Sequence, residues 1–352
     1  MPRLRRADCS GPGIRRVRRG KGFSYVDDDG VRVAEPEDLA RISELGIPPA
    51  WEDVWICADP RGHIQATGVD AAGRKQYRYH DEWRRRRDAQ KFDEMLDFAR
   101  ALPALREHVA ADLRAGDALT RERVLACALR LLDRGFFRIG TEEYAESNES
   151  FGLATMRKEH VTIEDGGTMV FDYPAKSGKQ RLQAVVDPLA VDIVTKLKRR
   201  RGGGDELLAY KQGRRWRDVR SGDINEYIKD VTGADYSAKD FRTWNATVLA
   251  AVALAVAGEV ADTKSGRKRA ITRAVKEVSF YLGNTPAVCR ASYIDPRVFD
   301  AYEGGLIIRP ALEKAADAPP DQLPIHHPAV EAAVIDLIGE HSSAPGVEKI
   351  AA

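Results

Sequence analysis

Five side chains between residues 138 and 293 have the chemical character that phosphoryl transfer requires. They are two arginines, a lysine, an amide and a tyrosine, namely Arg138, Arg242, Lys176, Asn284 and Tyr293. A phenol has a pKa of about 10, so it becomes a nucleophile at neutral pH only where positive charge favours its phenolate. Guanidiniums stay protonated and present planar donor forks that match phosphate oxygens. These residue types could let a phenol attack a phosphodiester.

The segments that carry these side chains have recognisable sequences. They read Arg138-Ile-Gly-Thr-Glu-Glu-Tyr144, Tyr173-Pro-Ala-Lys176-Ser-Gly-Lys179, Lys239-Asp-Phe-Arg242-Thr-Trp and Leu282-Gly-Asn284-Thr-Pro-Ala-Val-Cys-Arg-Ala-Ser-Tyr293. A fifth block lies upstream, Gly73-Arg-Lys-Gln-Tyr-Arg-Tyr79. Taken in their order along the chain, the five blocks resemble those of poxvirus-type and bacterial type IB DNA topoisomerases.

The resemblance implies a role for each of the five side chains. Tyr293 would be the nucleophile that forms a 3′-phosphotyrosyl bond, and Arg138 and Arg242 would stabilise the transition state. Lys176, expected at the tip of a hairpin, would protonate the leaving 5′ oxygen. Many relatives carry histidine at the position of Asn284, whose amide would donate a hydrogen bond to a phosphate oxygen. The implied activity is relaxation of supercoiled double-stranded DNA by a monomer that closes around the duplex as a clamp, without ATP, metal or other cofactor.

A second group of residues is assigned to DNA binding. In the upstream block, alternation places Tyr77 and Tyr79 on one face of a strand, and Gln76 is suited to bidentate contact with adenine. We expect Arg74 and Lys75 to contact phosphates. On the resemblance alone, Tyr144 and Lys179 are also assigned to DNA.

Two other classes of protein remain as alternatives. Tyrosine site-specific recombinases use a similar arginine, lysine and tyrosine set, although they usually carry a helical amino-terminal domain and act as tetramers. A catalytically inactive DNA-binding protein could keep the same fold. Of the histidines, His326 and His327 are expected to be ordinary residues at a helix entry, whereas His160 could be structural or could contact a phosphate.

The net charge conceals local clusters of basic residues. The 352 residues include 56 Lys and Arg against 54 Asp and Glu, for a net charge of +2. Basic residues nevertheless gather at 84–87, at 198–201 and near the amino terminus, at Arg3, Arg5, Arg6, Arg15, Arg16, Arg18, Arg19 and Lys21. Such runs either neutralise phosphates or are merely solvated.

Several classes of protein are disfavoured by what the sequence lacks. It has no phosphate-binding glycine loop, dinucleotide fingerprint or HExxH motif, and its four cysteines are scattered without a CxxC pair. The longest apolar run, residues 243–258, is shorter than the roughly 20 residues of a membrane span and is expected to form a buried helix. No signal-peptide pattern is found. We therefore expect a cytoplasmic, nucleoid-associated protein with no membrane partner.

The hydrophobic pattern predicts an α+β protein with two domains. Residues 1–20 are expected to be a flexible basic tail, residues 21–85 a β-rich DNA-binding domain, and residues 86–345 a mainly helical catalytic domain with a small sheet. Within the catalytic domain we predict strands at 160–164, 168–173 and 181–186, with a hairpin turn at 165–167. Asp187 and Pro188 are expected to open the next helix.

Overall fold

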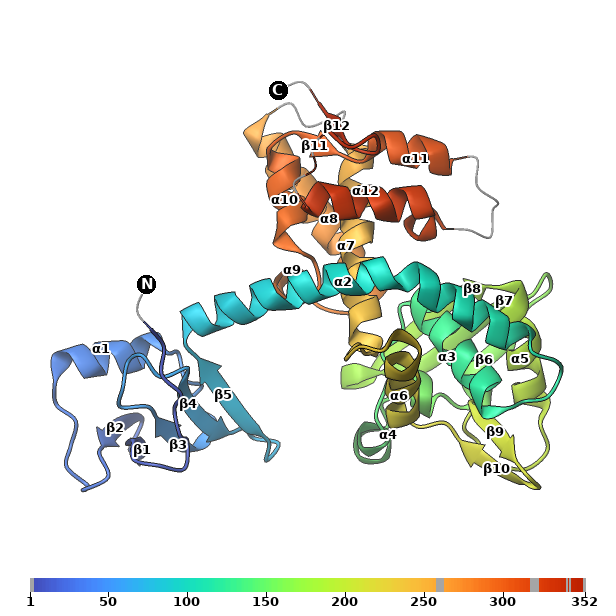
Figure 1. Ribbon diagram of the computed structural model, residues 1–352. Helices are drawn as coiled ribbons and strands as arrows, with labels where there is room; N and C mark the ends of the chain where they lie inside the picture. The colour runs from blue at the N-terminus through green and yellow to red at the C-terminus, as the bar shows by residue number, and fades with distance from the viewer. Residues whose placement is uncertain (1–2, 258–262, 317–322, 340, 342, 351–352) are drawn as a thin grey trace. The chain divides into compact units, whose positions relative to one another are not determined.

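The computed structural model describes residues 3–257, 263–316, 323–339, 341 and 343–350 (Figure 1). It divides into two compact units, residues 1–92 and 93–352. The first unit is rich in strands, and the second is mainly helical with small sheets, which confirms the predicted fold class. None of the helices in the described residues is both long and apolar enough to cross a bilayer.

Within residues 3–92, the first unit consists of an antiparallel five-stranded sheet, a short helix and the start of the long helix that begins at Asp81. Its strand order is β2-β1-β3-β4-β5, and its core contains Ile14, Ile42, Val54, Ile56 and Ala66. The elements are β1 (Ile14–Arg19), β2 (Gly22–Val26), α1 (Pro36–Glu44), β3 (Glu52–Ile56), β4 (Ile64–Val69) and β5 (Lys75–Tyr79).

The prediction of a flexible tail over residues 1–20 was wrong for residues 14–19. These residues form β1, which pairs with both β2 and β3. Ile14 is buried in the core, and Arg16 stacks over Phe23 at 4.2 Å and donates to the Pro48 carbonyl at 3.1 Å. One apolar anchor and a satisfied guanidinium therefore order a segment that its arginine content suggested was disordered. Residues 1 and 2 of the predicted tail lie outside the described residues.

Two further features of the first unit were not expected. Helix α1 interrupts the strands and begins with Pro36, which suits a first helical position, and it buries Ile42. The charged segment 81–88, which spans the predicted domain boundary at residues 85 and 86, is the start of the 34-residue helix α2 (Asp81–Arg114). Glu82 pairs with Arg85 and Arg86 along that helix, so the charges support helix rather than loop.

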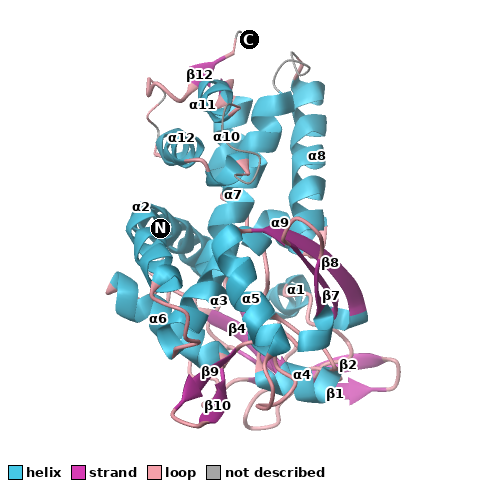
Figure 2. Ribbon diagram, turned by 90° about the vertical axis from the view of Figure 1, so that its right-hand side faces the viewer, coloured by secondary structure: helices cyan, strands magenta, loops and turns pink. Residues whose placement is uncertain are grey.

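The second unit surrounds helix α7 (Ala238–Ala257), whose first 14 residues are almost all buried. Figure 2 shows α7 beside α8 (Lys264–Leu282), with strands β7 and β8 near the carboxyl end of α8. The other helices are α3 (Arg121–Gly135), α4 (Glu142–Asn148), α5 (Pro188–Arg199), α6 (Ser221–Thr232), α9 (Pro286–Ser292), α10 (Pro296–Glu303), α11 (Arg309–Ala315) and α12 (Pro328–Ile338).

Among its described residues, the second unit also has three small sheets. Strands β6 (Val161–Ile163), β7 (Thr168–Ala175) and β8 (Lys179–Val186) form the largest, and the turn η3 (Lys176–Gly178) joins β7 to β8. The pairs β9 (Ala209–Gln212) with β10 (Arg215–Asp218) and β11 (Leu306–Ile307) with β12 (Glu348–Lys349) form the others. The predicted strands are confirmed, and the Asp187 carboxylate caps α5 by accepting from the Leu189 and Ala190 amides.

A buried polar network joins α12 to the centre of the second unit. Arg106 of α2 pairs with Asp133 of α3 at 2.8 Å and with Glu331 of α12 at 2.5 Å. Glu331 also accepts the indole N–H of Trp244, which lies two residues beyond Arg242 on α7, at 2.9 Å. Burial of the Asp133 carboxylate opposes its ionisation, but the charge of Arg106 outweighs this effect. The pKa of Asp133 therefore falls to about 2. The network fixes α12 against the helix that carries one of the candidate arginines.

Candidate active site

The carboxyl end of helix α8 organises the candidate site. The helix stops at Gly283, whose φ of +62° is accessible to glycine without steric cost. The Asn284 amide then donates back to the Ser279 carbonyl at 3.1 Å. The Phe280 carbonyl accepts from the Gly283 amide at 3.2 Å, and the carbonyls of residues 281–283 lie past the last helical bond, so this end of the helix can accept from side chains.

Both candidate arginines bind these carbonyls. Arg242, only 4% exposed, donates to the Leu282 carbonyl at 2.9 Å and also to the Phe136 carbonyl. Arg138 donates to the Gly283 carbonyl at 2.8 Å and also to the side-chain oxygen of Asn284. The partial negative charge at a helix carboxyl end favours cations there, so the fold itself holds two guanidiniums close together.

Tyr293 lies beside this cluster. Helix α9, capped by the Thr285 hydroxyl, ends where Tyr293 begins, and the Arg242 guanidinium carbon lies 5.4 Å from the centre of the tyrosine ring. Arg242 Nε and Asn284 Nδ2 are buried, and within the described residues neither has a partner that meets strict hydrogen-bond geometry. Buried donors in such a position can donate hydrogen bonds to an anionic ligand.

Electrostatics favour the ionised phenol. Burial of Tyr293 opposes ionisation, but the charge of Arg242, polar contacts from Arg242 and Asn284, and the charge of Arg138 together lower the pKa of Tyr293 below its ordinary value. Burial, followed by the neighbouring charge of Arg138, lowers the pKa of Arg242 to about 10. At neutral pH the arginine is therefore still protonated beside a more acidic phenol.

The structure does not bring Lys176 into this cluster. Lys176 lies at the exposed tip between β7 and β8, as expected, and among the described residues it makes no hydrogen bond or ion pair. Lys179, the first residue of β8, and Tyr144, on α4, are also exposed. These three side chains face solvent rather than the buried donors.

The predicted DNA-binding residues of the first unit lie on β5, except Arg74, which directly precedes it. Tyr77 and Tyr79 are 42% and 39% exposed, and their rings stack with centres 6.0 Å apart, which places them on one face as expected. Lys75 is exposed, and its ammonium lies 5.9 Å from the Tyr77 ring centre. Arg74 and Gln76 are both held by Asp70, at 2.9 Å in each case.

The structure shows one site-lining residue that the sequence reading treated only as the start of a strand. Arg181 of β8 donates to the carbonyls of Phe280 and Tyr281, next to those that Arg138 and Arg242 use. The hydrophobic alternation of the strand pointed the other way, because Leu182 and Val186 are apolar yet exposed, whereas residues 181, 183 and 185 are less exposed than their neighbours. An arginine among residues that point inward calls for a partner.

The histidines have structural surroundings. His160 packs edge-on against Phe151, and its Nδ1 accepts from the Arg157 amide at 3.1 Å. His326 is buried in the turn before α12, and burial lowers its pKa to about 4. In the described part of the chain, no three His, Cys, Asp or Glu side chains are arranged to hold a metal ion.

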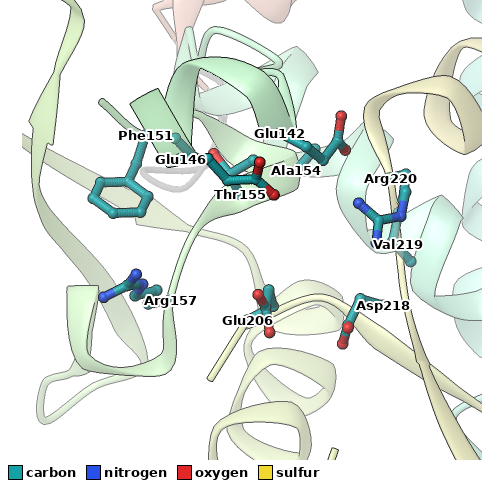
Figure 3. A pocket seen from close by; sticks show the side chains of 11 residues that line it. Glu142, Glu146, Phe151, Ala154, Thr155, Arg157, Glu206, Asp218, Val219 and Arg220 are labelled. Atoms are coloured by element: carbon teal, nitrogen blue, oxygen red, sulfur yellow. The ribbon is translucent and has the colours of Figure 1, made fainter. Parts of the chain in front are cut away.

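A separate cavity in the second unit contains none of the candidate catalytic residues (Figure 3). Its volume is about 170 Å³, and its charged lining has four carboxylates against two guanidiniums: Glu142, Glu146, Glu206, Asp218, Arg157 and Arg220. Burial and the nearby Glu206 raise the pKa of Asp218. An acidic lining disfavours phosphate, which distinguishes this cavity from the Tyr293 site.

Two models of known protein families match separate parts of the chain. A family model described as the catalytic core of eukaryotic DNA topoisomerase I matches residues 80–304, and one described as the amino-terminal domain of bacterial DNA topoisomerase IB matches residues 22–70. The chain is 30% identical to DNA topoisomerase 1B of Acanthamoeba polyphaga mimivirus over 298 residues, which cover 83% of this chain and 88% of the viral protein. It is 27% identical to DNA topoisomerase 1 of Schizosaccharomyces pombe over 161 residues, which cover 46% of this chain and 19% of that protein.

Proposed function

The chain belongs to the type IB DNA topoisomerase family, and from this premise we propose that Tyr293 cuts and reseals one strand of duplex DNA. The observation that carries the proposal is a phenol of lowered pKa beside Arg242, with buried Arg242 Nε and Asn284 Nδ2 donors next to it. The family membership decides against the tyrosine recombinase alternative.

The proposed reaction exchanges one phosphodiester for another. The Tyr293 oxygen attacks phosphorus, the bond to the 5′ oxygen breaks, and the tyrosine is left joined to the 3′ phosphate. Resealing is the reverse attack by the 5′ hydroxyl. Because a phosphodiester bond is conserved throughout, the energy of the broken bond is stored in the protein–DNA link and ATP is not consumed.

The charged donors have separate proposed tasks. Arg138, Arg242 and Asn284 bind the non-bridging oxygens, where negative charge grows in the transition state. Because the Asn284 side-chain oxygen accepts from Arg138, its Nδ2 is left to donate. Lys176 supplies the proton that the leaving 5′ oxygen needs, and its exposed ammonium is accessible to a bound duplex.

The first unit has a proposed role in reading the duplex. The stacked pair Tyr77 and Tyr79 and the neighbouring Lys75 form an exposed surface with aromatic, hydroxyl and cationic character, suited to phosphate and base-edge contacts. Arg74 and Gln76 would exchange Asp70 for DNA. We also propose that the protein acts as a monomer on nucleoid DNA.

A relaxation assay tests this function directly. Supercoiled plasmid is incubated with the native protein in EDTA without ATP, and reactions are stopped with denaturant to trap any covalent protein–DNA adduct. The native protein should relax the plasmid and yield an adduct, and Tyr293→Phe should do neither. Tyr302→Phe is the matched control, because Tyr302 is a buried tyrosine of the same unit in α10. Relaxation by the Tyr293→Phe protein would refute the proposal, and absence of any native adduct would favour an inactive DNA-binding protein.

A further inference from the structure

Arg181 joins two structural elements that carry different parts of the proposed site. Its guanidinium leaves strand β8 and donates to the Phe280 carbonyl at 2.7 Å and to the Tyr281 carbonyl. Both acceptors belong to the last turn of α8. Together with Arg138 and Arg242, it completes a set of three arginines on the four consecutive carbonyls of residues 280–283.

The contact extends to the residue beside Asn284. A Cβ added at Gly283 would lie 3.2 Å from the guanidinium carbon of Arg181, tighter than most side-chain contacts. The guanidinium therefore lies close against the backbone of Gly283. This residue both ends α8 and fixes the direction in which Asn284 leaves the helix.

On the other side, Arg181 is fixed within the β7–β8 hairpin. In the strand register, Arg181 is directly opposite Tyr173, and Tyr173 stands three residues before Lys176. The Tyr173 hydroxyl donates to Gln183 at 2.7 Å, and Gln183 donates to the Gly135 carbonyl. Burial of Tyr173 raises its pKa to about 12, so it remains a neutral donor despite the neighbouring charges of Arg181, Arg242 and Arg138.

We propose that Arg181 is a positioning residue that holds the hairpin carrying Lys176 in place against the α8 end that carries Asn284. The inference rests on the proposed function, because it assigns Lys176 the role of proton donor. Arg181 makes its contacts with backbone carbonyls and with the hairpin, so it acts through Lys176 and Asn284 rather than on the phosphate. Its loss would leave Lys176 present but displaced from the donors at the end of α8, which Arg138 and Arg242 still hold.

The chemistry of the leaving group separates this role from a general effect on folding. A substrate with sulfur in place of the 5′ oxygen at the scissile bond releases a thiolate, and a thiol with a pKa of about 8.5 leaves without protonation. A protein whose proton donor is misplaced should therefore recover its rate on the sulfur substrate. A protein that is merely destabilised, or whose arginines have moved, should be slow on both substrates.

The experiment measures single-turnover adduct formation on matched oxygen and sulfur duplexes for the native protein, Arg181→Ala, Arg181→Lys and Lys176→Ala. Arg217→Ala is the control, because Arg217 is also a strand arginine but bonds Gln212 of the paired strand β9 rather than the end of α8. On the oxygen duplex, Arg181→Ala should be slower by about 10- to 100-fold, as expected for misplacement of a catalytic group by about 1 Å. DNA binding and the melting temperature of this variant should stay near those of the control.

On the sulfur duplex, both Lys176→Ala and Arg181→Ala should recover most of the lost rate, and Arg181→Lys should lie between Arg181→Ala and the native protein on the oxygen duplex. If Lys176→Ala recovers and Arg181→Ala does not, the inference about Arg181 is overturned while the proposed function stands. If neither recovers, the role of Lys176 is wrong, and the inference falls with it. If Arg181→Ala does not fold, the same comparison is made with Arg181→Lys.

Discussion

The arginine–tyrosine cluster and the tip of the β7–β8 hairpin differ in how completely folding prepares them. In the cluster, Arg242 is 4% exposed and bonded to two backbone carbonyls, and Arg138 is tied to Gly283 and Asn284. At the hairpin tip, Lys176 is exposed and, among the described residues, has no hydrogen-bond or ion-pair partner. Folding alone thus orders the donors that we propose bind the phosphate, whereas only the base of the hairpin is fixed, through Arg181.

The difference has a physical origin. Donors that stabilise a developing charge work best when they are already oriented, because no reorganisation is then needed during the reaction. A lysine ammonium, in contrast, is strongly hydrated and sits on a flexible stem, so its burial before DNA binds would be costly. On the proposed roles, the duplex itself completes the surroundings of Lys176.

The largest expected effect comes from the buried side of this comparison. Arg242→Ala should slow adduct formation by roughly 10³-fold, because it removes a preorganised donor to the transition state. It should also destabilise the protein by about 1–3 kcal/mol, because the Phe136 and Leu282 carbonyls lose their partner. Single-turnover cleavage and thermal melting measure the two effects. A full rate in this variant would remove Arg242 from the site.

Substitution at the exposed side should affect rate without affecting stability. Lys176→Ala should slow cleavage by about 100-fold, the lower range for loss of a general acid, and leave the melting temperature unchanged. The same two assays apply. A large drop in melting temperature would break the comparison, since it would show that the hairpin tip is already packed in the free protein.

The pH dependence should reflect the cluster. The cleavage rate should rise by up to about tenfold per pH unit as the Tyr293 phenolate forms. The rise should begin at a lower pH than for an ordinary tyrosine, because neighbouring cations lower the pKa of the Tyr293 phenol. In Arg138→Gln the rising limb should move to higher pH, because one of these cations is removed. An unmoved limb would mean that Arg138 does not act on the phenol.

Substitutions of Asn284 test whether its side-chain amide contributes to the cleavage rate. Asn284→Ala should slow cleavage by about three- to tenfold, the value of one neutral hydrogen bond. Asn284→His should keep or raise the rate, since a histidine can accept from Arg138 and still donate through its other nitrogen. Relaxation kinetics measure both. An alanine variant with native kinetics would exclude Asn284 from the reaction.

The smallest effect is expected in the first unit. The double variant Tyr77→Phe, Tyr79→Phe keeps the stacked rings but removes both exposed hydroxyls, so DNA binding should weaken by about threefold or less. The cleavage rate at saturating DNA should not change. Binding titrations with a short duplex, alongside single-turnover cleavage, make the test. A change in the saturated rate would show that this surface influences the chemistry.

The candidate site residues were predicted from the resemblance of five ordered blocks to one protein family, because no single arginine, lysine or tyrosine carries a catalytic signal by itself. Local structure did carry its own signals: Asp187 and Pro188 predict the start of a helix, and the turn at 165–167 predicts the hairpin. The α+β fold class follows from these signals together with the change of hydrophobic pattern along the chain.

The rest depended on contacts that leave little trace in the sequence. Backbone carbonyls have no residue type, so nothing in the sequence showed that Arg138, Arg181 and Arg242 converge on one helix end. Strand β1 was mistaken for a tail because arginine content outweighed the single anchor Ile14. Helix α1 was missed because it is short and only Ile42 is fully buried.

The contact between Glu331 and Trp244 limits how far the chain can be shortened. The matched catalytic core stops at residue 304, but α12 lies beyond it and supplies the carboxylate that both Arg106 and the Trp244 indole use. A fragment trimmed to the matched core would leave a buried indole N–H without its acceptor, two positions from Arg242. Any minimal catalytic fragment must therefore retain α12 or replace Trp244 with a side chain that needs no acceptor.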